Sequence, residues 1–172
     1  MPPKKQPLFI DLDETLIYAR EATAPAEPPL RNAQFAAGHE IVVRPEAPEL
    51  LRLCRAGGRQ VFLFTRAFFG FALTASQTFA LGFDERTIFS IAMILNCRRG
   101  LCPGAALIDN RPPHTESTQD KMEALGIPPE QVWVIPSFEP PHFPSARLFL
   151  LGLPHRLARL DRAAQTRPAR NR

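Results

Sequence analysis

The sequence predicts an α/β fold, in which helices cover both faces of a parallel sheet. Short apolar runs without polar alternation, the pattern of strands buried on both faces, start near Leu8, Gln60, Ala105 and Gln131. Segments of helical length separate these runs, as in a parallel sheet built from repeated strand–helix units. The chain has 172 residues, of which 45% are apolar, and no linker divides it. These values fit one domain with a full core.

The first half of the chain contains two of these central strands. Residues 8–10 predict the first, and residues 40–44 are rich in β-branched residues and closed by a proline. Residues 48–56 predict a helix, because a proline stands in its first turn, an acid follows, and glycines come after its end. Residues 60–65 predict the second central strand, and residues 68–79 have the length of a helix.

The second half continues this alternation. Residues 87–94 are ambiguous and favour a strand followed by a turn. Residues 105–110 predict the third central strand, and residues 131–136 predict the fourth. Between them, residues 115–125 predict a short helix with a threonine or serine cap at its start and a glycine after its end.

The net charge of +4 is distributed unevenly along the chain. Residues 147–172 hold seven arginines and one acid, Asp161, which leaves 14 bases and 16 acids in residues 1–146. The charge is therefore compatible with a nucleic-acid partner only at the tail, for which a solvated end is the favoured interpretation. We expect the tail to start as a short helix and to continue as a solvated end. The sequence thus predicts a domain over residues 7–150 and a basic helix or tail over residues 151–172.

The cysteines and apolar runs indicate the cellular setting. Cys54, Cys97 and Cys102 lack the spacing of a disulfide framework or a zinc site. No apolar run reaches the length of a membrane span, and the one after residue 6 is too short for a signal peptide. We therefore expect a reducing, cytoplasmic setting and no membrane partner. The four histidines share no metal-ligand spacing and are expected at the surface.

Polar side chains end three of the four central strands. Asp11 and then Asp13 follow the first strand, Thr65 ends the second, and Asp109 and Asn110 end the third. Because parallel strands end at one edge of the sheet, these side chains are expected to converge there. Two close carboxylates need a cation such as Mg²⁺ between them or a division of roles between nucleophile and acid. A lone pair of aspartates also fits a solvated acidic turn, but the convergence favours a catalytic site.

Residues 9–16, with the sequence FIDLDETL, resemble the DxDx[TV] signature of the haloacid-dehalogenase (HAD) superfamily of phosphotransferases. Residues 62–65 resemble the second motif of this superfamily, and residues 107–110 resemble the fourth. The Asp-Asn form of the fourth motif and the Val-Arg-Pro at 43–45 are most similar to the RNA-polymerase C-terminal-domain phosphatases and NLI-interacting-factor-like phosphatases. The similarity covers about residues 7–138. It implies a Rossmann-like, HAD-like sheet with a minimal cap.

The resemblance also implies roles for the converging residues. Asp11 would be the nucleophile that forms an aspartyl-phosphate, and Asp13 would be the general acid and then the general base. Mg²⁺ would be bound by Asp11, the backbone carbonyl of Asp13, and the Asn110 side chain. The Thr65 hydroxyl and the N–H group after it would bind a phosphoryl oxygen. Two residues would support the site from behind: Thr15 and Asp109.

One expected group is missing from the pattern. The third motif of the superfamily supplies a lysine that binds the nucleophile and the phosphate, but no lysine lies between Thr65 and Asp109. Arg98 or Arg99 could take its place, because arginine can bind phosphate through two hydrogen bonds. Both are equally compatible with solvated loop residues. Arg66, next to Thr65, is a further cation that we expect to contact substrate.

The short segments between the motifs leave no room for a large lid domain. An open site suits a bulky phosphorylated substrate, either a phosphoprotein Ser/Thr side chain or a polynucleotide end. A small phosphometabolite stays open as an alternative if a loop within residues 20–40 closes over it. A non-catalytic binding module with the same fold also stays open: the two retained aspartates argue against it, and the missing lysine argues for it.

Overall fold

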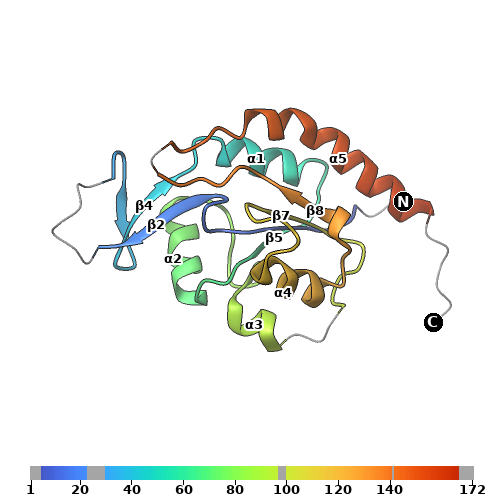
Figure 1. Ribbon diagram of the computed structural model, residues 1–172, viewed down its shortest axis with the longest axis horizontal. Helices are drawn as coiled ribbons and strands as arrows, with labels where there is room; N and C mark the ends of the chain where they lie inside the picture. Colours follow the sequence, from blue (N-terminus) through green and yellow to red (C-terminus); the bar gives the residue numbers. More distant parts are fainter. Residues whose placement is uncertain (1–4, 23–29, 97–99, 141, 167–172) are drawn as a thin grey trace.

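The core of the molecule is a five-stranded sheet in the order β6-β5-β1-β7-β8 (Figure 1). This computed structural model describes residues 5–22, 30–96, 100–140 and 142–166. The strands are β1 (Leu8–Ile10), β5 (Val61–Phe64), β6 (Ile88–Phe89), β7 (Ala106–Asp109) and β8 (Val132–Val134). All pairs are parallel, and β1 is central, with Leu8 opposite Val61 on one side and Ala106 on the other. The predicted α/β fold with a parallel sheet is confirmed.

Helices cover both faces of this sheet. They are α1 (Ala47–Arg55), α2 (Phe69–Thr78), α3 (Ile91–Asn96), α4 (Glu116–Leu125) and α5 (Arg147–Thr166), with a 3-10 turn at Pro129–Gln131. Alternate residues of a strand point to opposite faces. Leu8 and Ile10 accordingly join a core cluster with α1, α2 and α5, whereas Phe9 joins a second cluster with α4. Figure 1 shows α1 and α5 on one side of the sheet and α3 and α4 on the other.

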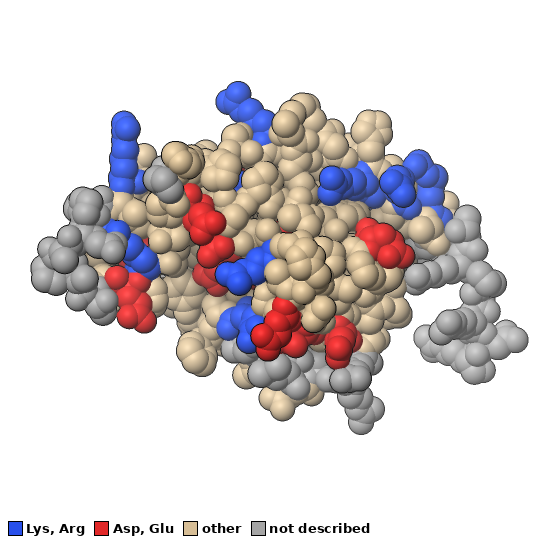
Figure 2. All heavy atoms as spheres, in the orientation of Figure 1, with Lys and Arg blue, Asp and Glu red and all other residues tan. Residues whose placement is uncertain are grey.

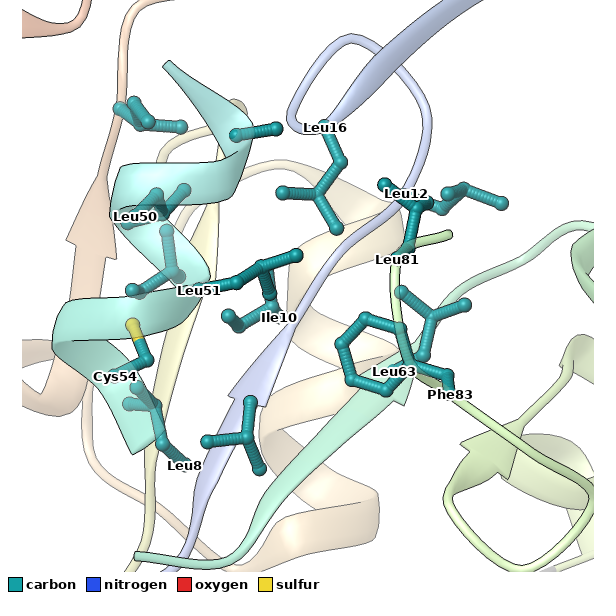
Figure 3. Close-up of a cluster of buried hydrophobic side chains, with 14 of the residues drawn as sticks. Leu8, Ile10, Leu12, Leu16, Leu50, Leu51, Cys54, Leu63, Leu81 and Phe83 are labelled. Carbon is teal, nitrogen blue, oxygen red and sulfur yellow. The ribbon is translucent and has the colours of Figure 1, made fainter. Parts of the chain in front are cut away.

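The first core cluster is centred on the contact between β1 and α1. Figure 3 shows Leu50, Leu51 and Cys54 on α1 beside Leu8 and Ile10 on β1, and all five are buried. Full burial of such a leucine or isoleucine is worth about 1.5–3 kcal/mol. Burial also raises the pKa of the Cys54 thiol to about 12. The thiol therefore stays protonated at neutral pH and contributes packing.

α1 and α4 begin and end where the sequence predicts. α1 has Pro48 and an acid in its first turn. α4 has Thr115 as its N-cap and Gly126 as its C-cap, with φ at 71°. A Cβ atom on Gly126 would lie 2.6 Å from the Cα of Gly100. Only glycine fits this position, because a side chain would strain the left-handed backbone and would also collide with the neighbouring loop.

A small antiparallel sheet lies between the loop after β1 and the start of α1. It consists of β2 (Ile17–Glu21), β3 (Gln34–Ala36) and β4 (His39–Val43), in the order β2-β4-β3. Of these three strands only β4 is predicted from the sequence, and the prediction misses the short apolar run at residues 16–19 that enters β2. β2 forms through its pairing with β4, in which Tyr18 lies opposite Val42. Figure 1 shows this sheet projecting beyond one end of the central sheet.

The turn predicted after residue 90 is a helix instead. β6 has only two residues, and α3 begins at Ile91. The isoleucines in this segment favour a strand by their intrinsic preference. β6 pairs with β5 alone and ends at Phe89, so tertiary packing decides the conformation of the residues that follow.

α5 changes the organisation predicted for the end of the chain. The boundary expected between residues 150 and 151 falls inside α5. The sequence predicts that the tail begins as a short helix and then continues as a solvated end; residues 154–166 are helical, and Leu153, Leu157 and Leu160 are buried in the first core cluster. α5 therefore completes the core of the domain. Residues 167–172 lie outside the described part of the chain.

The described arginines of α5 are exposed or half-buried, whereas its acid, Asp161, pairs with a buried arginine. Asp161 forms a 2.8 Å ion pair with the buried Arg59. Arg59 also donates to the backbone carbonyl of Gln6, so it links α5 to the segment just before β1. Figure 2 shows basic side chains over the outer face of α5. Among the described residues, no helix combines the length and the apolar character needed to cross a membrane.

Candidate active site

A cavity of about 280 Å³ lies at the carboxyl end of β1, where the sequence predicts a site. Asp11 follows β1 directly, and Asp13 lies in the loop beyond it. Seven residues line the cavity: Asp11, Asp13, Glu14, Arg66, Arg111, Ser117 and Lys121. They come from three segments that follow β1, β5 and β7. Three acids and three bases therefore share one small space.

Lys121 forms the floor of this cavity. Its Nζ lies 2.7 Å from Oδ1 of Asp11 and 2.8 Å from Oδ2 of Asp109. The three side chains are 4%, 8% and 1% exposed, respectively. Burial alone would lower the pKa of Lys121, but the two adjacent carboxylates raise it overall. The ammonium group is therefore charged at neutral pH and offsets the charge of the candidate nucleophile.

The carboxylates of the cavity outnumber their buried cation. Burial is the largest cause that raises the pKa of Asp11 to about 7, and Lys121 opposes it, while Asp109 and Asp13 raise it further. Burial likewise raises the pKa of Asp13, against the lowering by Lys121 and by the hydrogen bond from Thr65. Both aspartates are thus held in an environment that favours a proton or an additional cation.

The segment after β5 contributes one buried and one exposed residue. Thr65 is fully buried, and its hydroxyl donates to Oδ2 of Asp13 at 3.4 Å and accepts from the backbone N–H of Ala67 at 3.1 Å. The hydroxyl expected to bind phosphate therefore orients Asp13. Arg66 lines the cavity and is 44% exposed, 3.6 Å from Asp120. Its placement is compatible with the substrate contact that the sequence predicts.

Asn110 lies behind the cavity in a hydrogen-bond network. Its backbone N–H donates to the Thr15 hydroxyl at 3.1 Å, and that hydroxyl donates to Oδ1 of Asn110 at 3.3 Å. Its Nδ2 donates to Oε2 of Glu14 at 2.8 Å and to Oγ of Ser137 at 3.2 Å. The Thr15 hydroxyl thus joins the loop after β1 to Asn110. In this arrangement the Asn110 oxygen faces Thr15, so a metal-binding role for it stays a prediction.

Asp109 supports the site from behind. It is fully buried, and its Oδ1 accepts from the backbone N–H of Arg111 at 2.9 Å. Its Oδ2 accepts from Lys121. Asp109 therefore orients the lysine of the cavity floor, whereas the resemblance implies that it would orient a ligand or a metal-bound water.

The lysine that the sequence pattern lacks is present at another position. Lys121 lies in α4, after Asp109, so a search between Thr65 and Asp109 does not find it. The proposed substitutes Arg98 and Arg99 belong to residues 97–99, which lie outside the described part of the chain. A signal for Lys121 exists in the sequence, because it is the only lysine after residue 5.

Besides Lys121, three residues of the cavity are not predicted by the sequence as site residues: Glu14, Arg111 and Ser117. Glu14 has φ at 58° and joins Asn110 and Ser137 through its carboxylate. Arg111 lines the cavity, is 55% exposed, and lies 3.8 Å from Glu14. Glu14 and Arg111 lie beside predicted residues, but sequence spacing does not show which neighbours of a motif face the cavity.

The oxygen atoms around the cavity fit a hard divalent cation. In the described part of the chain, no three His, Cys, Asp or Glu side chains are grouped as metal ligands. Mg²⁺ needs fewer, because it binds through one or two carboxylates and completes its shell with water and substrate phosphate. Of the ligands that the resemblance implies, Asp11 and Asp13 line the cavity, whereas Asn110 lies behind it. The raised pKa values of Asp11 and Asp13 fit the same conclusion, because a cation would offset their charge.

Comparisons with known proteins find matches among solved structures. No protein-family model and no curated protein matches this chain. The chain is similar to the structure of the fission yeast RNA polymerase II CTD phosphatase Fcp1 bound to beryllium fluoride. The TM-score is 0.47 and the identity 13%, and the match covers 95% of this chain and 54% of that chain. This chain therefore spans about half the length of that phosphatase.

Proposed function

We propose that this chain is a Mg²⁺-dependent phosphatase that hydrolyses phosphomonoesters through an aspartyl-phosphate on Asp11. One observation carries the proposal: Nζ of Lys121 lies within 2.8 Å of both Asp11 and Asp109 at the floor of a cavity that Asp13 also lines. A buried carboxylate beside a buried ammonium and a second carboxylate supplies a nucleophile, a charge that stabilises phosphate, and a proton carrier.

In the first step, Asp11 attacks phosphorus with Oδ2, since Lys121 binds Oδ1. The bond between phosphorus and the leaving oxygen breaks, and Asp13 donates its proton to that oxygen. Burial raises the pKa of Asp13, so a protonated fraction is available for this role. The products of the step are an alcohol and the aspartyl-phosphate.

In the second step, Asp13 is a carboxylate and accepts a proton from water. The water oxygen attacks phosphorus, the bond from phosphorus to Asp11 breaks, and inorganic phosphate leaves. Lys121 stays beside both the nucleophile and the transferring group, and Thr65 keeps Asp13 oriented. A bound Mg²⁺ would supply positive charge to the phosphoryl oxygens.

We further propose a bulky phosphorylated substrate, such as a phosphoprotein Ser/Thr side chain. The segment between the loop after β1 and α1 forms only three short strands. Arg66 and Arg111 line the cavity and are about half exposed, so they can meet a substrate that remains largely outside. Small phosphometabolites and polynucleotide ends are the alternatives to compare in an assay.

The test is hydrolysis of p-nitrophenyl phosphate with and without Mg²⁺. We expect turnover only with Mg²⁺, and we expect Asp11→Asn and Asp13→Asn to abolish it. Asp84→Asn is the matched control, because Asp84 lies on an exposed loop before β6. Acid-quenched wild-type enzyme should carry an acyl-phosphate that Asp11→Asn lacks. A wild-type protein that binds phosphate analogues saturably but never turns over would instead be a non-catalytic binding module.

A further inference from the structure

Arg44 is a fully buried arginine that follows β4 and lies beside the loop of the candidate site. Its exposure is 0%, and it is among the largest fully buried side chains of the described residues. A guanidinium has five N–H donors and no acceptor, so its burial requires several oxygen partners. Burial lowers the pKa of Arg44 to about 10. It is therefore a charged group inside the protein at neutral pH.

The partners of Arg44 are backbone carbonyls from two segments, the loop after β1 and the connection between β8 and α5. Nε donates to Thr15 at 2.6 Å, and Nη2 donates to Glu14 at 3.1 Å and to Pro136 at 2.5 Å. Nη1 donates to Pro144 at 3.2 Å. The guanidinium thus joins the loop after β1 to two points of the connection between β8 and α5.

We propose that Arg44 is a positioning residue of the candidate site, which holds the loop after β1 in its working conformation through the carbonyls of Glu14 and Thr15. The effect on catalysis rests on the proposed function, but the effect on loop geometry does not. The backbone of Glu14 is left-handed, with φ at 58°, which costs of order 1 kcal/mol for a residue other than glycine. Such a conformation persists only where neighbouring groups fix it.

Two hydrogen bonds hold the Glu14 carbonyl in this conformation. One comes from Arg44, and the other comes from the backbone N–H of Phe138 at 2.6 Å. The ring of Phe138 also lies 4.8 Å from the guanidinium carbon of Arg44. Arg44 therefore contacts both the carbonyl and the residue that donates the second bond to it.

The side chains of Glu14 and Thr15 connect the loop after β1 to the other residues of the candidate site. Glu14 accepts from Asn110 and from Ser137, and the Thr15 hydroxyl is bonded to Asn110. Asp13 immediately precedes Glu14. A shift of this loop would displace Asp13 and Asn110 together. A displacement near 1 Å can cost about 100-fold in rate even where the substituted residue never touches the substrate.

The test compares Arg44→Met and Arg44→Lys with Arg59→Met. Arg59 is a matched control, because it is 5% exposed, donates to the backbone carbonyl of Gln6, and lies at the opposite end of β1. All three variants are expected to lose stability. With p-nitrophenyl phosphate, we expect both Arg44 variants to lower kcat about 100-fold with little change in KM. Arg59→Met should keep kcat within about twofold of wild type, because it leaves the loop after β1 intact.

Amide hydrogen exchange tests the geometry without any turnover. The N–H groups of Phe138 and Asn110 report on the loop, whereas the N–H of Leu63, which bonds Thr87 at 2.8 Å inside the sheet, reports on global stability. In Arg44→Lys, we expect Phe138 and Asn110 to lose at least tenfold more protection than Leu63. In Arg59→Met, the three should fall together.

The kinetic and the hydrogen-exchange experiments together distinguish failure of the positioning role from failure of the proposed function. Equal losses at all three amides in Arg44→Lys, or failure of that variant to fold, would overturn the positioning role in favour of a purely structural one. Unchanged kcat in the folded Arg44 variants would overturn it as well. A wild-type protein without turnover would refute the proposed function alone, and the exchange data would then decide the role of Arg44.

Discussion

Nζ of Lys121 lies 2.7 Å from Oδ1 of Asp11, although the two residues are 110 positions apart in the sequence. The contact joins α4 to the loop after β1 and places a cation against the candidate nucleophile. Because the pair is buried, water cannot take the place of either side chain if that side chain is removed. The position of this ammonium group is therefore as important for the chemistry as the aspartates themselves.

Replacement of Lys121 by methionine should remove most of the activity. We expect kcat to fall about 100- to 1,000-fold, since one preorganised charge at the transferring group is lost. The loss of the cation also leaves two buried carboxylates unpaired, so the free energy of unfolding should fall by about 2–4 kcal/mol at pH 7. Lys121→Arg should restore stability better than activity, because a planar guanidinium does not reproduce the position of Nζ. Steady-state kinetics and urea unfolding would measure the two effects, and full activity in Lys121→Met would remove the basis of the proposed function.

Asp11 should make the folded protein less stable as the pH rises. Its pKa is raised from an ordinary value of 3.8 to about 7, so the folded protein binds this proton more tightly than the unfolded chain does. The free energy of unfolding contributed by this group is then fully present below pH 4 and is lost as the pH rises towards 7. Asp11→Asn should therefore have a higher Tm than wild type at pH 8 without divalent ions, and the difference should shrink near pH 4.

The control for this pH dependence is Asp84, whose pKa is lowered by hydrogen bonds from Thr87 and from the backbone of Arg86. The pH dependence of its contribution to the free energy of unfolding is opposite to that of Asp11, because the contribution of Asp84 is lost as the pH falls. Asp84→Asn should therefore lower the Tm at pH 8 and have less effect near pH 3. If the Tm values of Asp11→Asn and wild type differ by the same amount at every pH, Asp11 does not titrate as described.

Arg66 and Arg111 should affect substrate binding more than chemistry. Both line the cavity at its exposed side, while Lys121 occupies the floor. We expect Arg66→Gln and Arg111→Gln each to raise KM for a phosphoserine peptide about five- to tenfold, with kcat nearly unchanged. Arg52→Gln is the matched control, because Arg52 is an exposed arginine on α1 that pairs with Glu49. A fall in kcat without a change in KM would instead place these arginines at the reacting phosphoryl group.

The buried face of α5 should be needed for the stability of the whole domain. Leu157→Ala should lower the free energy of unfolding by about 2–4 kcal/mol, since Leu157 is buried against the sheet. Leu151→Ala, on the same helix, should cost almost nothing, because Leu151 is 74% exposed. Urea denaturation of the two variants would measure the difference. Equal losses would mean that α5 is held by something other than its apolar face.

The sequence predicts the central sheet well because its signal is local. The apolar runs before Asp11, Thr65 and Asp109 are visible in a few residues each, and the parallel arrangement then brings their ends to one edge. The convergence of Asp11, Asp13 and Thr65 follows from this geometry. Helix ends such as Gly126 are equally local and were equally predictable.

Features that depend on contacts between distant segments could not be predicted from local sequence patterns. Lys121 contacts Asp11 because of the direction in which α4 leaves the sheet. The order of the motifs along the sequence does not reveal that direction. β2 pairs with β4, which follows it after more than fifteen residues, and the short apolar run around Tyr18 does not reveal that pairing. The burial of Leu157 depends on the sheet beneath α5, and the many arginines of that segment suggest a solvated helix.

The position of α5 in the chain order has a consequence for biosynthesis. The face of the sheet that carries Leu8 and Ile10 is covered in part by α5, which the ribosome makes after all eight strands. A nascent chain that has reached β8 therefore still exposes apolar surface that Leu153 and Leu160 later bury. Until translation passes these leucines, the emerging domain is a natural client for chaperones that bind exposed hydrophobic segments.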